Sequence, residues 1–344
     1  MNIFKNTLFT FIYVTASVNA QIDNDETMEK AGTASAQFLK ISYDSRGSAM
    51  GNTGVSIPGG ISSSFWNPAI IATIKKNEFG FFNSEWFASI SIDYFGLAIS
   101  NKKFGVIGFS IFSLSTPEDK VTTIYQPEGT GEKWNASDLS LSLSYAKALS
   151  NDFSIGGSIK FIQQKIWHAS AYTFAGDIGV LFTTPFNGTR LGASLSNYGG
   201  KMQMSGRDQK LSVDPDPNNQ GNVEFINADF ETDAFSLPLL FRVGISNELI
   251  KTKNTALIYS FDALYPSDGV EYLSTGVEMV FLEKYKIRAG LPSFTYDNSI
   301  EGLTLGLGLD QNISNGNSKI GFDYSLSDFG PLGTVQKIFL NIKF

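Results

Sequence analysis

The chain has 344 residues, of which 17% are charged and 13% aromatic, with 33 glycines, one histidine and no cysteine. Its 26 basic and 33 acidic residues give a net charge of −7, which disfavours nucleic acid as a partner because that affinity comes from neutralised phosphates. The lack of cysteine excludes disulfides, thiolate metal sites and a lipid-anchored cysteine. A single histidine excludes a multi-histidine metal centre. The composition is wrong for a coiled coil or a disordered tail, and unusual for a cytosolic enzyme.

Residues 1–20 have the pattern of a secretory signal peptide. One cation, Lys5, precedes a short apolar core over 8–14, and small residues end at Val18-Asn19-Ala20. The core is too short to span a membrane, so we predict export and cleavage near Ala20-Gln21. No later stretch reaches the about 18 consecutive apolar residues of a transmembrane helix. Any insertion into a membrane therefore uses strands.

Residues 21–76 precede the first clear strand pattern and are too apolar to be a simple tail. Asn67-Pro68 is expected to begin a short helix or turn. We single out Trp66, Asn67, Pro68 and Ala69 as a candidate motif of this segment. We interpret 21–76 as a hatch, or plug, for the barrel described next, because a barrel of about fourteen strands is wider than the eight-stranded kind that its own side chains fill.

From residue 77 onward, apolar residues alternate with small or polar ones; Leu305 and Leu307, for example, flank Gly306. Successive strand side chains face opposite sides, so each such segment has one apolar face and one small or polar face. Most segments are close to the about 9–11 residues with which a tilted strand crosses a bilayer. We therefore predict an all-β fold over 77–344, a transmembrane antiparallel β-barrel of about 14 strands. The expected strands are 77–84, 90–101, 103–115, 137–149, 151–164, 172–183, 188–198, 238–249, 254–262, 272–282, 285–292, 301–311, 318–327 and 335–344.

Loop lengths and the placement of charges favour a membrane barrel over a soluble sandwich. Long connections such as 116–136 and 199–237 alternate with tight ones such as 101–103, as do the extracellular loops and periplasmic turns of outer-membrane barrels. Most charged residues within the segments share the phase of Ser, Gly or Thr, which predicts that they face the lumen. These residues are Asp93, Lys160, Asp177, Arg242, Asp262, Glu278, Arg288 and Asp323.

The last segment carries a candidate outer-membrane insertion signal. Ile338, Leu340, Ile342 and Phe344 form its apolar phase, and the chain ends on the aromatic residue. A terminal aromatic that closes an alternating strand resembles the recognition signal of bacterial outer-membrane proteins. We therefore expect the protein in the outer membrane of a bacterium.

The second segment contains an apparent change of phase. Its apolar residues run Ile90, Ile92 and Tyr94, and then Phe95, Leu97 and Ile99. A change of phase predicts a bulge or kink, which we place at Tyr94, Phe95, Gly96 and Leu97. Such a kink either opens a lateral portal or is an ordinary bulge.

Parts of the sequence resemble a known family. The runs 37–41 and 46–51, followed by Phe65-Trp66-Asn67-Pro68-Ala69, are similar to the opening of the PorV/PorQ family, as are the strands 302–309 and 319–326 and the Phe-terminated end. The chain departs from the family at Ile70, where a glycine often follows Asn-Pro-Ala. The resemblance implies a FadL-like fourteen-strand outer-membrane barrel with an N-terminal hatch. It also implies a role in the type IX secretion system of Bacteroidetes.

Two functions remain open at this point. The first, from the resemblance, is a non-enzymatic secretion component whose extracellular loops bind cargo C-terminal domains, a translocon or a surface attachment protein. The second is a FadL-like transporter of hydrophobic small molecules. Membrane lipid and lipopolysaccharide are expected partners in either case. No enzyme or cofactor is expected: His168 is the only histidine, and no phosphate-binding or calcium-binding loop pattern is present.

Overall fold

The computed structural model describes residues 30, 32–215, 225–252, 254–313 and 318–344. The predicted signal peptide, 1–20, lies outside the described residues. Residues Ala31–Phe344 form one compact unit. In the part of the chain that the structure describes, no helix is long and apolar enough to cross a membrane.

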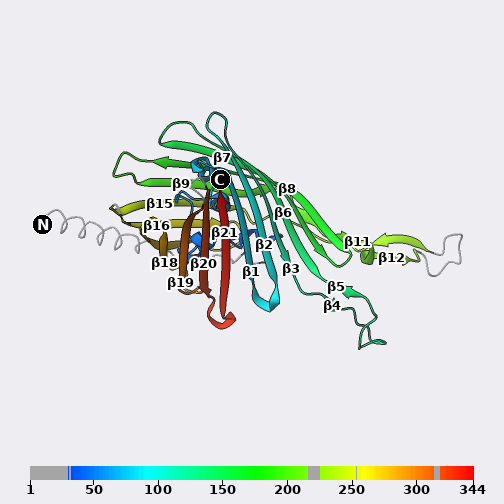
Figure 1. The fold of residues 1–344 in the computed structure, drawn as a ribbon. Coiled ribbons are helices and arrows are strands. Elements are labelled where there is room, and N and C mark those ends of the chain that lie inside the picture. The colour runs from blue at the N-terminus through cyan, green and yellow to red at the C-terminus, as the bar shows by residue number, and fades with distance from the viewer. Residues whose placement is uncertain (1–29, 31, 216–224, 253, 314–317) are drawn as a thin grey trace. The chain divides into compact units, whose positions relative to one another are not determined.

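The unit is a closed antiparallel β-barrel, which confirms the predicted fold class (Figure 1). Each long strand pairs with the next along the chain, and the pairing of the first with the last, and of β8 with β9, completes the ring. The described strands of the wall are β1 (Glu78–Glu85), β2 (Ser91–Asn101), β3 (Gly105–Ser115), β6 (Ala136–Ala148), β7 (Phe153–Ile166), β8 (Ala169–Thr183), β9 (Arg190–Gly199), β15 (Leu240–Lys251), β16 (Thr255–Pro266), β17 (Tyr272–Phe281), β18 (Tyr285–Leu291), β19 (Thr304–Ile313), β20 (Ser318–Asp328) and β21 (Thr334–Lys343).

The strands differ from the predicted segments mainly at their ends. β8 begins at Ala169 rather than at residue 172, and β16 continues to Pro266 rather than stopping at Asp262. At these ends the pairing continues although the alternation of apolar residues is lost. The pattern in the sequence reports the lipid-facing part of a strand, and hydrogen bonding extends beyond it.

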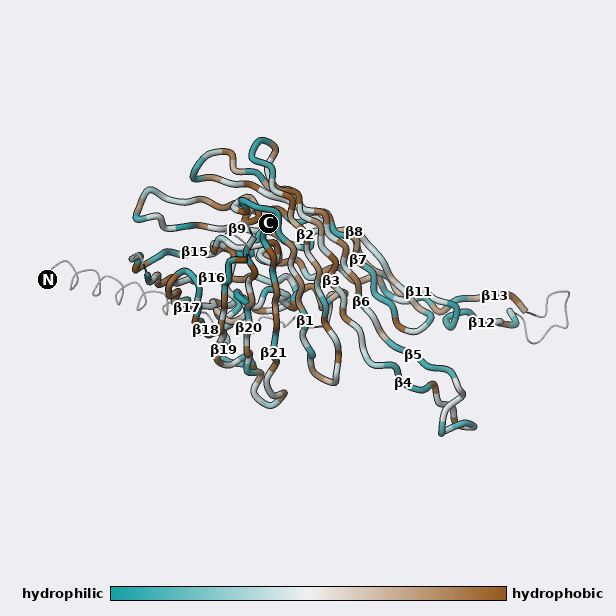
Figure 2. The backbone as a smooth tube through the Cα atoms, viewed as in Figure 1, coloured by the Kyte–Doolittle hydropathy of each residue, from teal (hydrophilic) through white to brown (hydrophobic). Residues whose placement is uncertain are grey.

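The two faces of the wall differ as predicted. On β19 the leucines Leu305 and Leu307 are exposed on the outside, whereas Gly306 and Gly308 face inward, and Figure 2 shows hydrophobic residues along the strands. Of the charged residues expected in the lumen, Lys160, Asp177, Arg242, Asp262, Glu278, Arg288 and Asp323 do face inward.

The prediction for Asp93 is wrong. Asp93 alternates with the inward-facing, buried Ile92 and Tyr94, so it lies on the outer face with Phe95. The reason is that Ile92 and Tyr94 pack against the hatch, so at this height the inner face is the more apolar one.

The connections differ sharply between the two ends of the barrel. At one end they include 116–135, with β4 (Asp119–Lys120) and β5 (Lys133–Trp134), and the described parts of 200–239, and these project beyond the wall (Figure 1). The latter holds β10 (Met202–Gln203), β11 (Ser205–Gly206), η5 (Arg207–Gln209), β12 (Lys210–Val213), β13 (Ile226–Asp229) and β14 (Ala234–Phe235). At the other end the turns are short, such as 102–104. We call these the long-loop end and the turn end; the 3-10 turns η4 (Phe87–Ser89) and η6 (Gly330–Leu332) also lie at the long-loop end.

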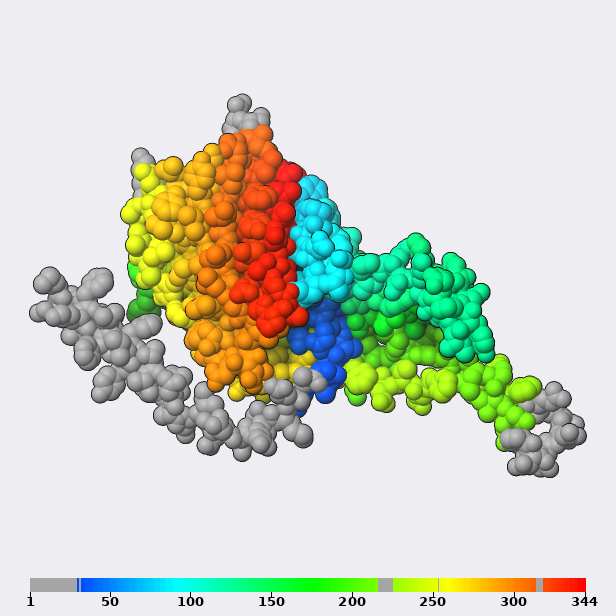
Figure 3. Space-filling view, turned by 90° about the horizontal axis from the view of Figure 1, so that it is seen from below, coloured from blue at the N-terminus to red at the C-terminus, as the bar shows by residue number. Residues whose placement is uncertain are grey.

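The described part of the hatch runs through the barrel from one end to the other. At the long-loop end Ala34 forms a bridge with Ser236, and at the turn end the Ser100 hydroxyl donates to the Ile74 carbonyl. Four short helices lie between: η1 (Gln37–Lys40), α2 (Ser45–Ala49), η2 (Ile61–Phe65) and η3 (Pro68–Thr73). Figure 3 shows part of this segment, in blue, between the strands of the wall.

The C-terminal strand closes the barrel. β21 pairs with β1, the Phe344 amide donates to the Asn77 carbonyl, and the Phe344 ring stacks on Phe79 at 5.5 Å. Ile338, Leu340 and Ile342 face outward.

We expect Phe344→Ser to lower the amount of barrel assembled in the outer membrane severalfold, because it removes the aromatic ring that stacks on Phe79 where β21 meets β1. The folded fraction is measured by heat modifiability on SDS gels of outer-membrane fractions. Phe104→Ser, at an exposed aromatic in a tight turn, is the matched control. Equal assembly of the two variants would exclude Phe344 as part of an insertion signal.

Candidate functional site in the barrel lumen

The motif Trp66-Asn67-Pro68-Ala69 attaches the hatch to the wall. Asn67 caps η3: its Oδ1 accepts from the Ala69 amide at 2.9 Å, and its Nδ2 donates to the Val180 carbonyl of β8 at 2.8 Å and to the Val55 carbonyl at 2.9 Å. Pro68 occupies the first turn of η3, where its missing N–H costs no hydrogen bond. This predicted set therefore lies together and is buried.

Trp66 fixes the hatch internally. Its indole Nε1 donates to Asp44 Oδ2 at 2.7 Å, and Asp44 also caps α2 by accepting from the Gly47 amide at 3.2 Å. A Cβ on Gly47 would lie 2.5 Å from Trp66 Nε1, so only glycine lets the indole pass. One carboxylate thus ties two parts of the hatch together.

A buried ion network holds α2 against the wall. Arg46 donates from Nε to Glu278 Oε2 at 2.9 Å and from Nη2 to Oε1 at 2.6 Å. Glu278 also accepts from Arg288, which in turn pairs with Asp323 at 2.6 Å. Burial works to lower the pKa of Arg46, but the adjacent Glu278 carboxylate outweighs it and the pKa is raised. Because Glu278 of the wall pairs with both Arg46 of the hatch and Arg288 of the wall, this network connects the hatch to the barrel.

A second anchor lies at the long-loop end. Lys40 Nζ contacts Asp268 Oδ2 at 2.9 Å, and the Gln37 side chain donates to the same oxygen at 2.6 Å. Burial acts to raise the pKa of Asp268, but these two hydrogen bonds and the Lys40 charge lower it overall. The hatch is therefore tied to the wall near both ends.

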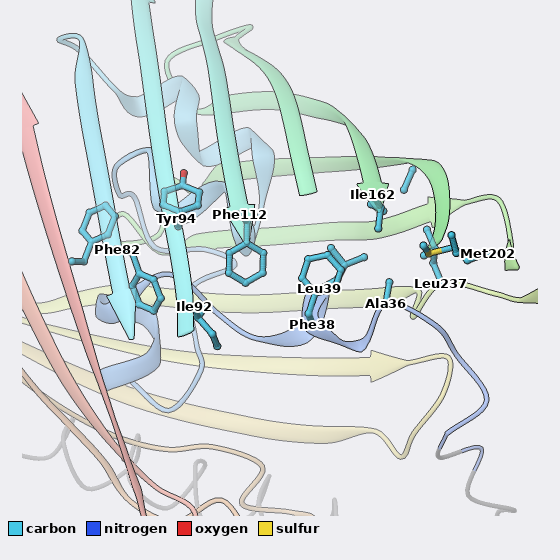
Figure 4. Packing of buried hydrophobic residues seen from close by; sticks show 13 residues of the cluster. Ala36, Phe38, Leu39, Phe82, Ile92, Tyr94, Phe112, Ile162, Met202 and Leu237 are labelled. Atoms are coloured by element: carbon cyan, nitrogen blue, oxygen red, sulfur yellow. The ribbon is translucent and has the colours of Figure 1, made fainter. Parts of the chain in front are cut away.

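Apolar and aromatic side chains fill the lumen toward the long-loop end (Figure 4). Tyr43 of the hatch stacks on Tyr94 with ring centroids 4.0 Å apart and lies 5.1 Å from Phe112, which stacks on Phe38 at 5.6 Å. Burial raises the pKa of Tyr43, so the phenol stays neutral. The buried members of this cluster, which we call the lumen cluster, are Ala36, Phe38, Leu39, Phe82, Ile92, Tyr94, Phe112, Ile162, Ala171, Ala175, Met202, Leu237 and Phe339.

Arg242 stands at the inner side of this aromatic region. It is 5% exposed, and its guanidinium lies 5.2 Å from the Phe65 ring and 5.7 Å from the Trp66 ring. Its Nη1 has no hydrogen-bond partner, and no carboxylate of a described residue lies within ion-pair distance. The Arg242 guanidinium therefore lies against aromatic faces and forms no ion pair with a described residue, although the more distant Asp177 and Asp262 carboxylates also act on its charge.

A polar cavity of about 420 Å³ lies toward the turn end, on the other side of the hatch. Its lining includes Arg46, Lys75, Lys286, Asp310 and Lys343. Lys286 and Lys319 both pair with Asp310 at 2.8 Å. The described lumen thus contains an aromatic cluster toward the long-loop end and a cavity lined by charged residues toward the turn end.

The predicted kink at Tyr94, Phe95, Gly96 and Leu97 is absent. Through these residues β2 keeps an unbroken register with both β1 and β3. The apparent phase change arises because Ile92 and Tyr94 face the lumen cluster while Phe95 and Leu97 face outward.

A register shift occurs instead between β8 and β9. There Ser196 and Asn197 of β9 oppose Asp177 alone, and Asn197 has a φ of 65°. The Asn197 amide donates to Asp177 Oδ1 at 2.8 Å and its side chain donates to the Pro238 carbonyl at 3.0 Å. Beyond Ser196 the pairing of β9 with β15 ends. Three members of the lumen cluster, Ala175, Met202 and Leu237, belong to the segments that meet at this break.

Several lumen residues gave no local signal in the sequence. Arg46, Tyr43 and Phe38 lie in an irregular segment without periodicity, so their contacts with β2, β3 and β17 depend on the closed barrel. His168 lies between Asp208 Oδ2 at 2.7 Å and Arg207 Nη2 at 2.8 Å. No group of three or more potential metal-ligating His, Cys, Asp or Glu side chains occurs among the described residues.

The closed wall, the internal hatch and the apolar outer face define the architecture of a transmembrane β-barrel with a filled lumen. The chain is similar to the Ralstonia pickettii toluene transporter TbuX (TM-score 0.52, 13% identity, covering 86% of this chain and 96% of TbuX). It is also similar to the Pseudomonas putida toluene transporter TodX (0.53, 12%, 88% and 97%) and to the monoaromatic hydrocarbon channel CymD (0.52, 12%, 87% and 96%). No protein-family model and no curated protein matches the sequence, so the comparisons lend no support to the narrower PorV/PorQ resemblance.

Proposed function

We propose that the protein carries hydrophobic small molecules across the outer membrane, as a non-enzymatic FadL-like transporter. The observation that supports this proposal best is the lumen cluster: buried aromatic side chains in the interior of a membrane barrel offer an apolar molecule an environment that water does not. The fold shared with two toluene transporters points the same way.

The pairing of β9 with β15 ends beyond Ser196, and we call this place the break between β9 and β15. It is the place where a ligand would reach this cluster. Met202 and Leu237 are buried there, and neither belongs to a long strand of the wall. A molecule dissolved in the membrane would meet apolar side chains at the break rather than a continuous hydrogen-bonded sheet. In this proposal a lateral portal, one of the two alternatives that the sequence left open for β2, lies at β9 instead.

Arg242 defines the ligand further. A buried guanidinium with an unsatisfied Nη1 favours a molecule that is mainly apolar but carries one oxygen acceptor. Passage past Arg242 into the polar cavity requires the hatch to move, because Phe65 and Trp66 of the hatch lie against its guanidinium. The structure thus corresponds to the closed state of the proposed transporter.

Filling the break tests the proposal. We expect Leu237→Trp to lower uptake of radiolabelled toluene or benzaldehyde severalfold in cells that express the protein, because the larger ring occupies the route to the cluster. Leu332→Trp, at an exposed site of the long-loop end, is the matched control. Uptake equal to that of cells without the protein, in wild type and both variants, would contradict transport; unchanged uptake in Leu237→Trp alone would contradict the route.

The projecting connections favour a second candidate, the secretion component implied by the PorV/PorQ resemblance. Ile124 and Tyr125 are 87% and 88% exposed between β4 and β5, and Phe225 and Phe230 are exposed beside β13. Exposed apolar residues far from the wall are typical of protein-binding surfaces. If this candidate is right, Ile124→Ser with Tyr125→Ser abolishes co-purification of secretion proteins or cargo and leaves hydrocarbon uptake unchanged.

A further inference from the structure

A polar patch lies on the outside of the wall over β1, β2 and β3. It consists of Asn83, Ser91, Asp93 and Ser113, which we call the wall patch. Their neighbours along each strand, Phe82, Ile92 and Phe112, are buried on the lumen side. The wall patch therefore lies on the outer face of the barrel, the face on which the other strands carry apolar residues.

The wall patch lies within the height of the apolar band. Asn83, Asp93 and Ser113 are successive cross-strand partners. The line of partners through them rises along the wall. In one direction it passes Leu257 and ends at Ile250, near the turn end of β15, and in the other it passes Leu139 and ends at Tyr172, near the long-loop end of β8. Leu139 and Tyr172 are thus farther toward the long-loop end than Asp93, and both are outward-facing apolar residues.

The apolar band is correspondingly narrow here. On β1 the outward apolar residues are Phe79 and Phe81 alone, about 7 Å apart along the strand, whereas on β8 they extend from Tyr172 to Phe182, about 33 Å apart. A lipid-facing band is about 25 Å tall. Lipid therefore covers β8 well, but it would leave polar groups of β1 to β3 in contact with hydrocarbon.

Asp93 is a prearranged acceptor without a cation. Asn83 Nδ2 donates to its Oδ1 at 2.8 Å, and Ser91 Oγ donates to its Oδ2 at 3.1 Å. The strands β21, β1, β2 and β3, which are described throughout, carry no Lys or Arg on their outer face, since Lys337 and Lys343 face inward. Ionisable groups at membrane depth normally have a partner.

We infer that the wall patch is the docking surface for a second membrane-embedded protein, one that places a Lys or Arg side chain against Asp93. Charge complementarity points to this occupant, because the outward carboxylates here, Asp93 and Glu85, have no opposite charge on the outer face of β21, β1, β2 or β3. A second copy of this chain is a poor occupant, since a symmetric contact would bring two Asp93 carboxylates together. The inference is independent of the proposed transport.

A site-specific photo-crosslink in native outer membranes tests this inference. Benzoylphenylalanine replaces Ser113, beside Asp93, and in a control it replaces Val277, an outward residue of β17. We expect one protein adduct from position 113 and none from 277. The adduct should persist with Asp93→Glu and be lost with Asp93→Lys, and its mapped peptide should contain a basic residue on the membrane-facing surface of the partner.

Folding of each variant is verified by heat modifiability, so that loss of the adduct is not loss of the barrel. Four outcomes would overturn the inference: an adduct with the mass of two copies of this chain, an adduct with lipopolysaccharide, an adduct that survives Asp93→Lys, or no adduct from position 113.

Discussion

Replacing Gly290 with leucine is expected to displace the hatch from the lumen and so convert the barrel into an open pore. Gly290 of β18 faces the hatch, and a Cβ there would meet the backbone of Met50 and Gly51. Gly51 has a φ of +70°, and its amide donates to Thr304 Oγ1 at 2.9 Å, so this piece of backbone has little freedom to yield. The strand pairing of the wall does not depend on that contact. The leucine should therefore displace α2 while the barrel persists.

The expected result of Gly290→Leu is a severalfold rise in ion conductance in planar bilayers and a new sensitivity of the cells to vancomycin. Ala289→Leu is the matched control, because Ala289 is the adjacent residue on the outer face of the same strand. A folded Gly290→Leu barrel with wild-type conductance would mean that the hatch does not close the lumen at this point.

Glu278→Ala is expected to cause the largest loss of stability. Glu278 is 1% exposed and accepts from both Arg46 and Arg288. Its removal leaves the partly buried Arg46 without its ion-pair partner and the fully buried Arg288 with Asp323 as its one remaining ion-pair partner among the described residues. Breaking a buried ion pair on one side costs about 3–5 kcal/mol, because the remaining charge stays buried and unpaired.

Urea unfolding of the purified barrel in liposomes measures this loss. Glu283→Ala, at an exposed residue of a tight turn, should change the free energy of unfolding little. The double variant Glu278→Met with Arg46→Met should recover part of the loss, since it removes a charge from each side of the pair. If Glu278→Ala were as stable as Glu283→Ala, the network would not support the fold.

The wall could be predicted from the sequence because its signal is local. A strand such as β19 shows its two faces directly in the alternation of Leu305 and Leu307 with Gly306 and Gly308. The lipid sets the outer face to apolar residues, and the hatch backbone sets the inner face to small ones: a Cβ on Gly306 would meet Ala49. Both constraints act on residues two apart, so they leave a period in the sequence.

The two wrong predictions for β2, the kink at Tyr94 and the inward direction of Asp93, have one common cause. On β2 the inner face is apolar too, because Ile92 and Tyr94 pack against Phe38 and Tyr43 of the hatch region. The period therefore suggested a change of phase at Tyr94, and it assigned Asp93 to the lumen. Such contacts link residues more than fifty positions apart, and nothing in the local pattern distinguishes a lipid-facing tyrosine from one that faces a hatch.

The candidate site could be predicted only in part, because some of its residues carry a local signal and others depend on contacts between distant parts of the chain. Trp66, Asn67, Pro68 and Ala69 could be singled out because an Asn-Pro pair is a local capping signal, and Asn67 does cap η3. The partners of that motif, such as the Val180 carbonyl and Asp44, come from other parts of the chain. In the sequence, Arg242 resembles the other charged residues predicted to face the lumen. Its contacts with the Phe65 and Trp66 rings, and its lack of an ion-pair partner among the described residues, are visible only in the folded structure.

The passage of the hatch through the ring constrains the order of biogenesis. Ala34 lies at one rim and Ile74 at the other, while β1, which follows directly, pairs with β21, which comes after all the other described strands of the wall in the chain. The hatch segment cannot enter from the side once the ring of strands is closed. Seating residues 34–74 after closure would require the segment before β1 to pass end-first through the ring. The simpler order places them while the sheet is still open and pairs β21 with β1 afterwards.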